Sequence, residues 1–600
     1  MREGQEARVN WPIWPTLGSE QMRLLDLQPA VDISDSLCCT LRMASLTQSP
    51  FYEAVSYVWG HDSHRKTIKV DGTETVITNN LFDVLHSLRR KDSVRTLWID
   101  ALCINQADPE ERYNQVKIMG RIYQQAFNVA IFLGSHWDGL DIARDYLELA
   151  AEREEAHFDP LLKPHLEVSN VPMTVLHKRN NLSRFFSSDW FFRVWTVQEF
   201  VLARQTSFLY GTTVIDGGRF MKGFASIRRH ISSRCCGPRS LLECGERFFD
   251  VMIHIESLIN MRASLASTDL LQVLHDCRRR KCTNPLDRIY GMLGMDFKGQ
   301  SSGILPDYSI TTEELFVGLT KEQMDRTKTL DILTYVDMGR QTVLNLPSFV
   351  PDWTMESTNR LTHMLSVDQQ LATTHYKASG EIPAKFEFRF KDNGHLMLTK
   401  GVIIGYIESV GTPGTFSDLE SFSQAKDIVS EARELARLPS QPPISWQAAT
   451  PQELAFWRTL CGNLTINYLE GDREWTVSDP ELDYESYLRW NRAMNKLQEG
   501  QPAVVGDEPF QDALIPNLSG RRFTRTETGL IGMVAADSLP GDVIVVLPGG
   551  RIPYVLREKH GTSALENAKT YRFIGNAYID GFMYGEAAEH DAEWASLFIV

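Results

Sequence analysis

One segment, Leu97 to Arg112, restricts the N-terminal fold more than any other part of the 600-residue chain. Its apolar first half, Leu97 to Ile104, predicts a strand that is buried on both faces of a sheet. Polar residues follow, and a helix is expected next. Asp108 is suited to the N-cap, Pro109 to the first helical position and Glu111 to the acid of a capping box. Strand, loop and helix in this order are typical of a parallel α/β sheet.

The neighbouring segments have the same pattern. Periodicity and turn residues predict strands at 52–60, 67–70, 75–77, 97–104, 129–134 and 207–211, and helices at 79–88, 109–126 and 189–204. Residues 135–183, with one helix near 142–153, are interpreted as an insertion. This alternation predicts a doubly wound parallel sheet with right-handed crossovers. Ligands of such sheets bind beyond the carboxyl ends of the strands, which here carry Trp59, Gly60, Asn105 and Gln106.

The length of the chain exceeds what one hydrophobic core usually supports, so several structural units are expected. We predict an N-terminal arm at 1–19, an α/β domain at 20–212, a helical region at 213–345 and a β-rich α+β region at 346–600. In the last region, alternating residues at 386–390 and 396–398 predict strands. A β-meander is expected from Phe523 onward.

Composition excludes several classes of protein. The chain has 62 Lys and Arg against 77 Asp and Glu, a net charge of −15, which argues against a nucleic-acid-binding surface. The basic run Arg278 to Lys281 is interpreted as a solvated helix end or loop. An odd count of nine cysteines favours a reducing compartment. No long apolar run predicts a membrane span, and residues 1–6 lack signal-peptide and myristoylation features, so we expect a cytoplasmic protein.

Three blocks of sequence resemble the heterokaryon incompatibility (HET) domain of filamentous fungi. They are Tyr52–Gly60, the segment Leu97–Ala126 and Arg193–Glu199, in that order. Segments further along the chain are similar to those that follow the HET domain in such proteins, namely Asp287–Gly294, Pro306–Ser309, Leu346–Trp353, Gly541–Ile544 and Tyr578–Glu586. The resemblance covers most of the chain from about residue 20.

The resemblance implies a role in fungal non-self recognition, a form of innate immunity that ends in programmed cell death. The HET pattern is itself similar to that of TIR domains, some of which cleave NAD. It implies a TIR-like fold, Glu199 as the catalytic residue, and NAD as a substrate without a cofactor or metal. The residues expected to bind substrate are Ser56, Trp59, Gly60, Asp100, Asn105, Gln106, Arg112, Arg193 and Trp195. Self-association through the HET domain and an unidentified protein partner or trigger are also implied.

Glu199 is the strongest catalytic candidate. Cleavage of NAD at C1′ of the ribose passes through an oxocarbenium-like centre, which a nearby carboxylate stabilises. Trp195 lies one helical turn earlier, so the two side chains are expected to share a face. Apolar neighbours would raise the pKa of the carboxyl group. The alternative is a structural carboxylate that pairs with Arg193, Arg204 or a backbone amide.

The other candidates also have structural alternatives. Asp100 would bind a ribose hydroxyl, or else cap the next loop or pair with Arg112. Asn105 and Gln106 would contact a base or ribose, or else only stabilise a turn. Trp59 would stack on a ring of the ligand, or else belong to the core.

Different functional classes remain as alternatives. The first is a non-enzymatic signalling module that acts by self-association, and the second is a diverged housekeeping or metabolite-sensing protein. A cysteine hydrolase would use Cys103 with His61 or His64. A zinc site would draw on His230, Cys235, Cys236, Cys244, His275, Cys277 and Cys282, although their spacing matches no paired CxxC motif.

Overall fold

The chain divides into two compact units, residues 1–309 and 310–600. The computed structural model describes residues 16–32, 34–60, 64–157, 162–164, 166, 181–232, 246–297, 303–336, 343–355, 360–391, 394–417, 420–469, 472–501, 509–559, 569–589 and 594–600. Most of the predicted arm at 1–19 and much of the predicted insertion at 135–183 lie outside the described residues. The helix expected near 142–153 is present as α4 (Leu140–Glu152).

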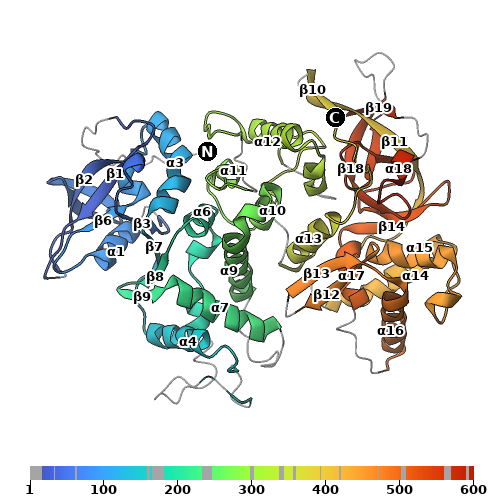
Figure 1. Cartoon of the computed structure of the whole chain (residues 1–600), viewed down its shortest axis with the longest axis horizontal. Coiled ribbons are helices and arrows are strands. Elements are labelled where there is room, and N and C mark those ends of the chain that lie inside the picture. The colour runs from blue at the N-terminus through green and yellow to red at the C-terminus, as the bar shows by residue number, and fades with distance from the viewer. Residues whose placement is uncertain are drawn as a thin grey trace. The chain divides into compact units, whose positions relative to one another are not determined.

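A nine-stranded mixed sheet forms the centre of the first unit (Figure 1). Its strands lie in the order β5-β4-β2-β1-β6-β3-β7-β8-β9. They are β1 (Gln21–Leu27), β2 (Cys38–Ser45), β3 (Glu53–Ser56), β4 (Arg65–Val70), β5 (Thr73–Thr78), β6 (Arg95–Trp98), β7 (Asn128–Gly134), β8 (Thr206–Tyr210) and β9 (Thr213–Asp216).

The four central strands, β6-β3-β7-β8, pair in parallel as the sequence predicts. The strands predicted at 67–70 and 75–77 form the antiparallel hairpin β4–β5, which the Asp71-Gly72 turn predicts. The prediction of a parallel sheet is wrong where β1 and β9 make antiparallel pairs with their neighbours. A short connection causes the difference at β9, because a tight turn can join only antiparallel neighbours. The pair β1 and β2 is absent from the prediction.

The chain changes direction across the sheet at β3. The next parallel strand, β6, lies on one side of β3, and the following strand, β7, lies on the other. The connection from β3 to β6 and the connection from β6 to β7 therefore run in opposite directions across the sheet. Open α/β sheets bind ligands at such a switch point, beyond the carboxyl ends of the strands. Ser56, the last residue of β3, marks this point.

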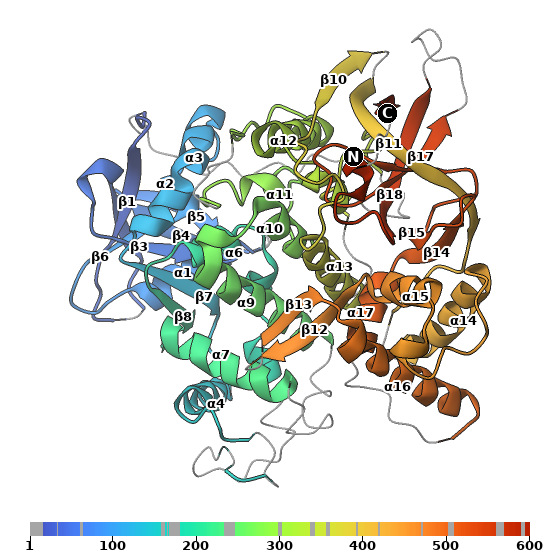
Figure 2. The ribbon, with the colours of Figure 1, turned by 45° about the vertical axis from the view of Figure 1, so that its right-hand side comes forward.

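Helices complete the first unit. They are α1 (Asn79–Leu88), α2 (Asp100–Cys103), α3 (Pro109–Gln125), α4, α6 (Thr196–Val201), α7 (Gly217–Ser232), α9 (Glu246–Ser264), α10 (Leu270–Asp276) and α11 (Asp287–Tyr290). The predicted apolar stripe of α1 is buried, and Asp108 caps α3 with Pro109 at its first position. Helices α4 and α7 pack side by side, as both ribbon views show (Figures 1 and 2).

Two predicted elements are shorter than expected. The strand predicted at 97–104 ends at Trp98, and four of the remaining residues, Asp100–Cys103, form the short helix α2. The helix predicted at 189–204 consists of a 3-10 turn, Asp189–Phe192, and the six-residue α6. The break occurs because Arg193 forms a β-bridge with Lys281. The amide of Val194 donates to the carbonyl oxygen of Lys281 instead of to a carbonyl oxygen of the preceding helical turn.

The basic run Arg278 to Lys281 is only partly solvated: Lys281 is exposed, but the interpretation as a solvated helix end or loop is wrong for Arg278 and Arg280. Arg278 is 3% exposed and Arg280 is fully buried. The Arg280 guanidinium donates to the carbonyl oxygens of Phe191 and His254, each at 2.8 Å. The run therefore anchors the segment around residue 280 to the core of the first unit.

The second unit contains a closed β-barrel. Each of the six strands β11, β14, β15, β18, β17 and β16 pairs with the next, and β16 pairs again with β11, in antiparallel register throughout. The strands of this unit are β10 (Phe386–Lys391), β11 (Gly394–Val410), β12 (Leu464–Leu469), β13 (Asp472–Val477), β14 (Arg521–Thr526), β15 (Ile531–Ala535), β16 (Val543–Val546), β17 (Tyr554–Lys559), β18 (Thr570–Ile579) and β19 (Ala595–Ile599).

The β-meander predicted from Phe523 onward is present in part, since β14 pairs with β15 and β16 pairs with β17, but the prediction did not include closure into a barrel. The 17-residue strand β11 has register shifts after Ile403 and after Ile407, and such bulges bend a strand enough to reach two neighbours. Figure 2 shows β11 running past β14 and β17. Apolar side chains from the barrel strands, including Ile407, Val534 and Ile544, form one buried cluster.

Helices flank the barrel strands in sequence. They are α12 (Thr312–Thr327), α13 (Arg360–Thr373), α14 (Ala425–Leu435), α15 (Pro451–Cys461), α16 (Pro480–Gln498), α17 (Pro509–Leu518) and α18 (Glu586–Glu589). Within the described ranges, none of the helices is long and apolar enough to cross a membrane.

Candidate functional site

Glu199 lies at the switch point of the parallel sheet. It is held there by Ser56, whose hydroxyl donates a hydrogen bond to Glu199 Oε2. The indole Nε1 of Trp190 donates to Ser56 Oγ at 2.6 Å. Only 1% of Ser56 and 8% of Glu199 are exposed. The end of β3, the 3-10 turn and α6 thus converge on one buried carboxyl group.

Burial raises the pKa of Glu199 to about 7. The hydrogen bond from Ser56 and the positive charge of Arg193 oppose this shift, and the negative charge of Asp100 adds to it. Neither cation that the sequence offered as an alternative partner, Arg193 or Arg204, forms an ion pair with Glu199 within the described part of the chain. Arg193 instead donates to the carbonyl oxygen of Tyr57 at 2.7 Å.

Trp59 and Asp100 form a second pair beside this centre. The Trp59 indole is 39% exposed and donates to Asp100 Oδ2 at 2.8 Å. The interpretation of Trp59 as a core residue is therefore wrong. Asp100 also accepts from the amide of Ala101 at 2.7 Å as α2 begins. Gly60 has a φ of +80°, which favours glycine, and turns the chain away from the strand end.

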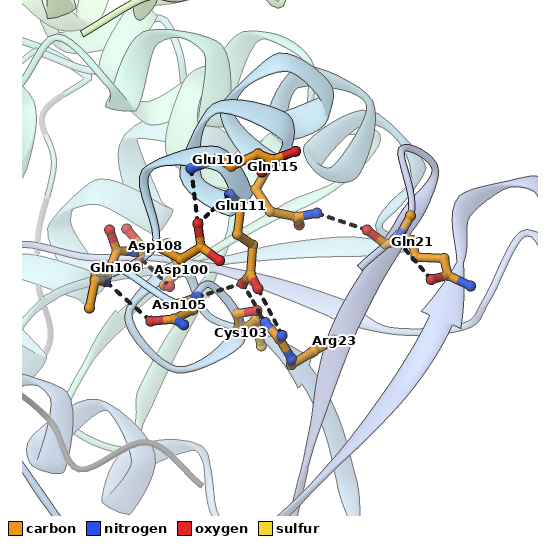
Figure 3. A network of polar contacts seen from close by, with 12 residues as sticks. Gln21, Arg23, Asp100, Cys103, Asn105, Gln106, Asp108, Glu110, Glu111 and Gln115 are labelled. Atoms are coloured by element: carbon orange, nitrogen blue, oxygen red, sulfur yellow. Dashed lines mark hydrogen bonds and ion pairs between the residues drawn. The ribbon is translucent and has the colours of Figure 1, made fainter. Parts of the chain in front are cut away.

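Asn105 and Gln106 contact their own loop. Gln106 Nε2 donates to the carbonyl oxygen of Asp100 at 3.1 Å, and Asn105 Oδ1 accepts from the amide of Ala107 at 3.2 Å. These are the contacts of the turn-stabilising alternative. The loop is thereby fixed close to Asp100 (Figure 3).

A buried ion pair between Arg23 and Glu111 holds the loop that contains Asn105. Arg23 on β1 donates to both carboxylate oxygens of Glu111, and its Nη2 lies 2.9 Å from Oε2. The same carboxylate accepts from the amide of Asn105 at 2.6 Å (Figure 3). The capping-box role predicted for Glu111 is wrong, because Arg23 draws its carboxylate away from the helix end. The only sequence signal for this pair was an arginine inside an apolar strand.

Among the described residues, no hydrogen bond joins the Trp195 side chain to Glu199. The Trp195 side chain lies beside the carboxyl group of Asp287 of α11, which accepts from the hydroxyl of Tyr308 at 2.8 Å. The guanidinium of Arg112 lies over the Tyr308 ring at 4.4 Å from its centroid. Trp195 and Arg112 therefore connect the α/β sheet to the segments that follow it, and neither Asp287 nor Tyr308 is among the predicted site residues.

The cysteine hydrolase alternative is not supported by the geometry. Cys103 lies in α2, and burial raises the pKa of its thiol to about 12, so it stays protonated at neutral pH. His64 is exposed, and His61 lies outside the described residues.

Three residues of the zinc alternative, Cys235, Cys236 and Cys244, lie outside the described ranges. The residues that the structure does describe contain no group of three or more His, Cys, Asp or Glu side chains arranged to hold a metal ion.

Two family models match the chain. Residues 52–199 match the family described as heterokaryon incompatibility protein (HET), and residues 467–600 match the Het-6 beta-barrel domain. Residues 52–199 of this chain are therefore a HET domain by sequence. The HET match begins at Tyr52, just before β3, and ends at Glu199. The Het-6 match includes five of the six strands that close the barrel.

The similarity of this HET-domain protein to one relative extends along both chains. It is 27% identical over 676 aligned residues to "Heterokaryon incompatibility protein 6, OR allele" of Neurospora crassa, which covers 97% of this chain and 96% of the relative. No solved structure matches the chain.

Proposed function

We propose that this HET-domain protein acts in heterokaryon incompatibility, the fungal non-self response that ends in cell death. The support is its similarity over nearly the full length of a Neurospora crassa protein named for that process. The HET domain and the barrel occur together in this one chain.

We further propose that the HET domain acts as a TIR-like NAD glycohydrolase. The observation that carries this proposal is the placement of Glu199 at the switch point of the parallel sheet, with a pKa of about 7. Release of nicotinamide leaves positive charge on the ribose, and a carboxylate in a poorly hydrated site stabilises that charge strongly.

In this proposal, the neighbouring residues have separate roles. Ser56 orients the carboxyl group through its hydroxyl, and Arg193 helps to keep it ionised. The exposed Trp59 indole offers a ring face for stacking, and Asp100 fixes the orientation of that indole. Gly60, Asn105, Gln106, Arg112 and Trp195 shape the surrounding loops rather than contact the substrate.

The 8% exposure of Glu199 sets a further condition on this proposal. The described state is the resting state, and self-association through the HET domain opens the site to substrate. An unidentified partner or trigger promotes that assembly.

The test measures NAD consumption by the purified chain with and without enforced oligomerisation. Assembled wild type is expected to release nicotinamide, and Glu199→Gln is expected to lose at least 100-fold in rate. Glu110→Gln, at an exposed acid on α3, is the matched control and should keep full activity. Assembled wild type that leaves NAD intact, together with full toxicity of Glu199→Gln in cells, would reject the enzyme.

A non-enzymatic signalling module is the second candidate. It is favoured by the same hydrogen bond from Ser56, because a buried and satisfied carboxyl group can be purely structural. In that case toxicity follows the degree of self-association and is unchanged by Glu199→Gln. Measuring oligomer size and toxicity in the same set of variants separates the two candidates.

A further inference from the structure

The second unit buries an arginine that has no acidic partner. Arg521, at the start of β14, is 6% exposed. Its Nη1 donates to Asn517 Oδ1 at 2.9 Å, and its Nη2 donates to Asn576 Oδ1 at 2.8 Å. Its Nε has no hydrogen-bond partner, and no carboxylate of the described residues lies within 4 Å of its guanidinium. Two neutral amides therefore hold a full positive charge.

Two other buried or partly buried arginines of this unit are neutralised by acids. Arg433, 2% exposed, pairs with the carboxylate of Glu453. Arg458 pairs with Asp580, with Nη2 and Oδ2 2.7 Å apart. Asp580 follows Asn576, one of the two amide partners of Arg521, by four residues, and its carboxylate is already used in the pair with Arg458. Arg521 therefore keeps its charge without an acidic partner among the described residues.

Arg521 lines a cavity in the second unit. The cavity has a volume of about 20 Å³, and its wall includes Tyr376, Cys461, Trp475, Asn517, Arg521 and Tyr578. One ordered water needs about 10–15 Å³ by the same measure, so a single small species fits. Two neutral donors of the wall are occupied, since the Tyr376 hydroxyl donates to the carbonyl oxygen of Gly462 and the Asn517 amide donates to two backbone carbonyls. The guanidinium is the charged group of this wall, and its Nε–H has no acceptor among the described residues.

Arg521 remains charged in this setting. Burial lowers the pKa of its guanidinium to about 10, which is still far above neutral pH. Burying a charge without a counter-charge is strongly unfavourable, and a neutral water offsets that cost less well than an anion. A species of halide size would both fill the cavity and neutralise the charge.

We propose that this cavity binds one small monovalent anion, chloride, on the guanidinium of Arg521. The anion accepts from the spare N–H groups, and the rings of Tyr376, Trp475 and Tyr578 separate it from solvent. The bound anion stabilises the second unit, because it binds the folded state and has no site in the unfolded chain.

The solution test uses thermal unfolding of the full-length chain at constant ionic strength, with sodium chloride replacing sodium gluconate. Gluconate is too large for a cavity of about 20 Å³. We expect a saturating rise in Tm of roughly 2–5 °C for the transition of the second unit. Arg521→Met should remove the rise, and Arg492→Gln, which removes an exposed charge, should keep it. The proposal is overturned if the Tm of the wild type does not change with chloride, or if it rises by the same amount in Arg521→Met.

A second test needs no variant. Crystals of the full-length chain grown with bromide should show an anomalous scattering peak within hydrogen-bond distance of the Arg521 guanidinium. Density for a water without anomalous signal would reject the anion site, whatever the folding behaviour of Arg521→Met.

Discussion

Glu199 links the stability of the first unit to pH. The pKa of its carboxyl group is about 7 in the folded chain, against an ordinary value of 4.5. Between these two values the folded state keeps a proton that the unfolded state has released. The free energy of unfolding therefore falls as pH rises from about 4.5 to about 7, by roughly 3 kcal/mol in total.

We expect Glu199→Gln to abolish this part of the pH dependence, because glutamine imitates the protonated side chain. The variant should match wild type near pH 4.5 and be more stable by up to about 3 kcal/mol at pH 8. Denaturant unfolding at several pH values measures the difference. Asp276, with a pKa also raised to about 7 by burial, is present in both proteins, so its contribution cancels. Parallel pH profiles for the two proteins would contradict the prediction.

The buried pair of Arg23 and Glu111 gives a second prediction for single residues. Arg23→Met would leave the Glu111 carboxylate buried without its cation, at a cost of about 3–5 kcal/mol in unfolding free energy. Arg42, on the neighbouring strand β2, pairs with Asp26 at the surface. Arg42→Met should cost less than about 1 kcal/mol. Equal losses in urea unfolding would show that burial of the pair contributes nothing.

For single residues, the sequence predicts which side chains are candidates for the site more successfully than it predicts what those side chains contact. Apolar neighbours of Glu199 correctly predicted a raised pKa, because burial depends on local composition. The partner of Trp195 could not be predicted, since Asp287 lies about ninety residues further along the chain. The hydrogen bond from Ser56 likewise depends on how β3 and α6 meet in the folded sheet.

Among the elements, α3 depends on a close approach of two backbones. Gly120 lies in α3, and a Cβ atom added there would stand 2.5 Å from the carbonyl oxygen of Gly294. Gly120→Ala should therefore destabilise the first unit by about 1–3 kcal/mol or more, because backbone must move. Gly318→Ala, in the exposed middle of α12, meets no atom within 4 Å and should stabilise by roughly 0.5–1 kcal/mol. Calorimetry of both variants provides the comparison, and a neutral Gly120→Ala would contradict the close approach.

Element prediction succeeded where local pattern and tertiary contacts agree. The stripe of α1 and the cap of α3 are local features, and both are present. The strand at 97–104 and the helix at 189–204 were predicted too long. The strand ends early because α2 begins at Asp100. The helix is interrupted because the amide of Val194 donates to the carbonyl oxygen of Lys281, which is distant in sequence.

At the scale of the whole molecule, the first compact unit extends well past the HET match. Residues 213–309 supply α9, Asp287, Gly294 and Tyr308, which contact α3, α6 or their flanking residues. A fragment of residues 1–212 should therefore lack cooperative unfolding, whereas 1–309 should unfold in one transition. Denaturant titrations followed by near-UV circular dichroism distinguish them. A cooperative 1–212 fragment with the midpoint of 1–309 would show that these contacts are dispensable.

The closed barrel was beyond reach of sequence patterns. Alternating residues identified β10 and β11, but the partners of β11 begin at residue 521 and residue 543. Closure depends on pairings between strands more than a hundred residues apart, and on bulges that leave no mark in hydropathy.

The ion pair beneath the Asn105 loop also limits how such chains can be recombined. Arg23 lies before residue 52 and Glu111 lies after it, so the pair straddles the start of the HET match. A hybrid gene that joins two parents at that point inherits the arginine from one and the carboxylate from the other. Where the parents differ at either position, functional crossovers are therefore expected before the codon for Arg23 or after the codon for Glu111, and a library of hybrids would show that bias directly.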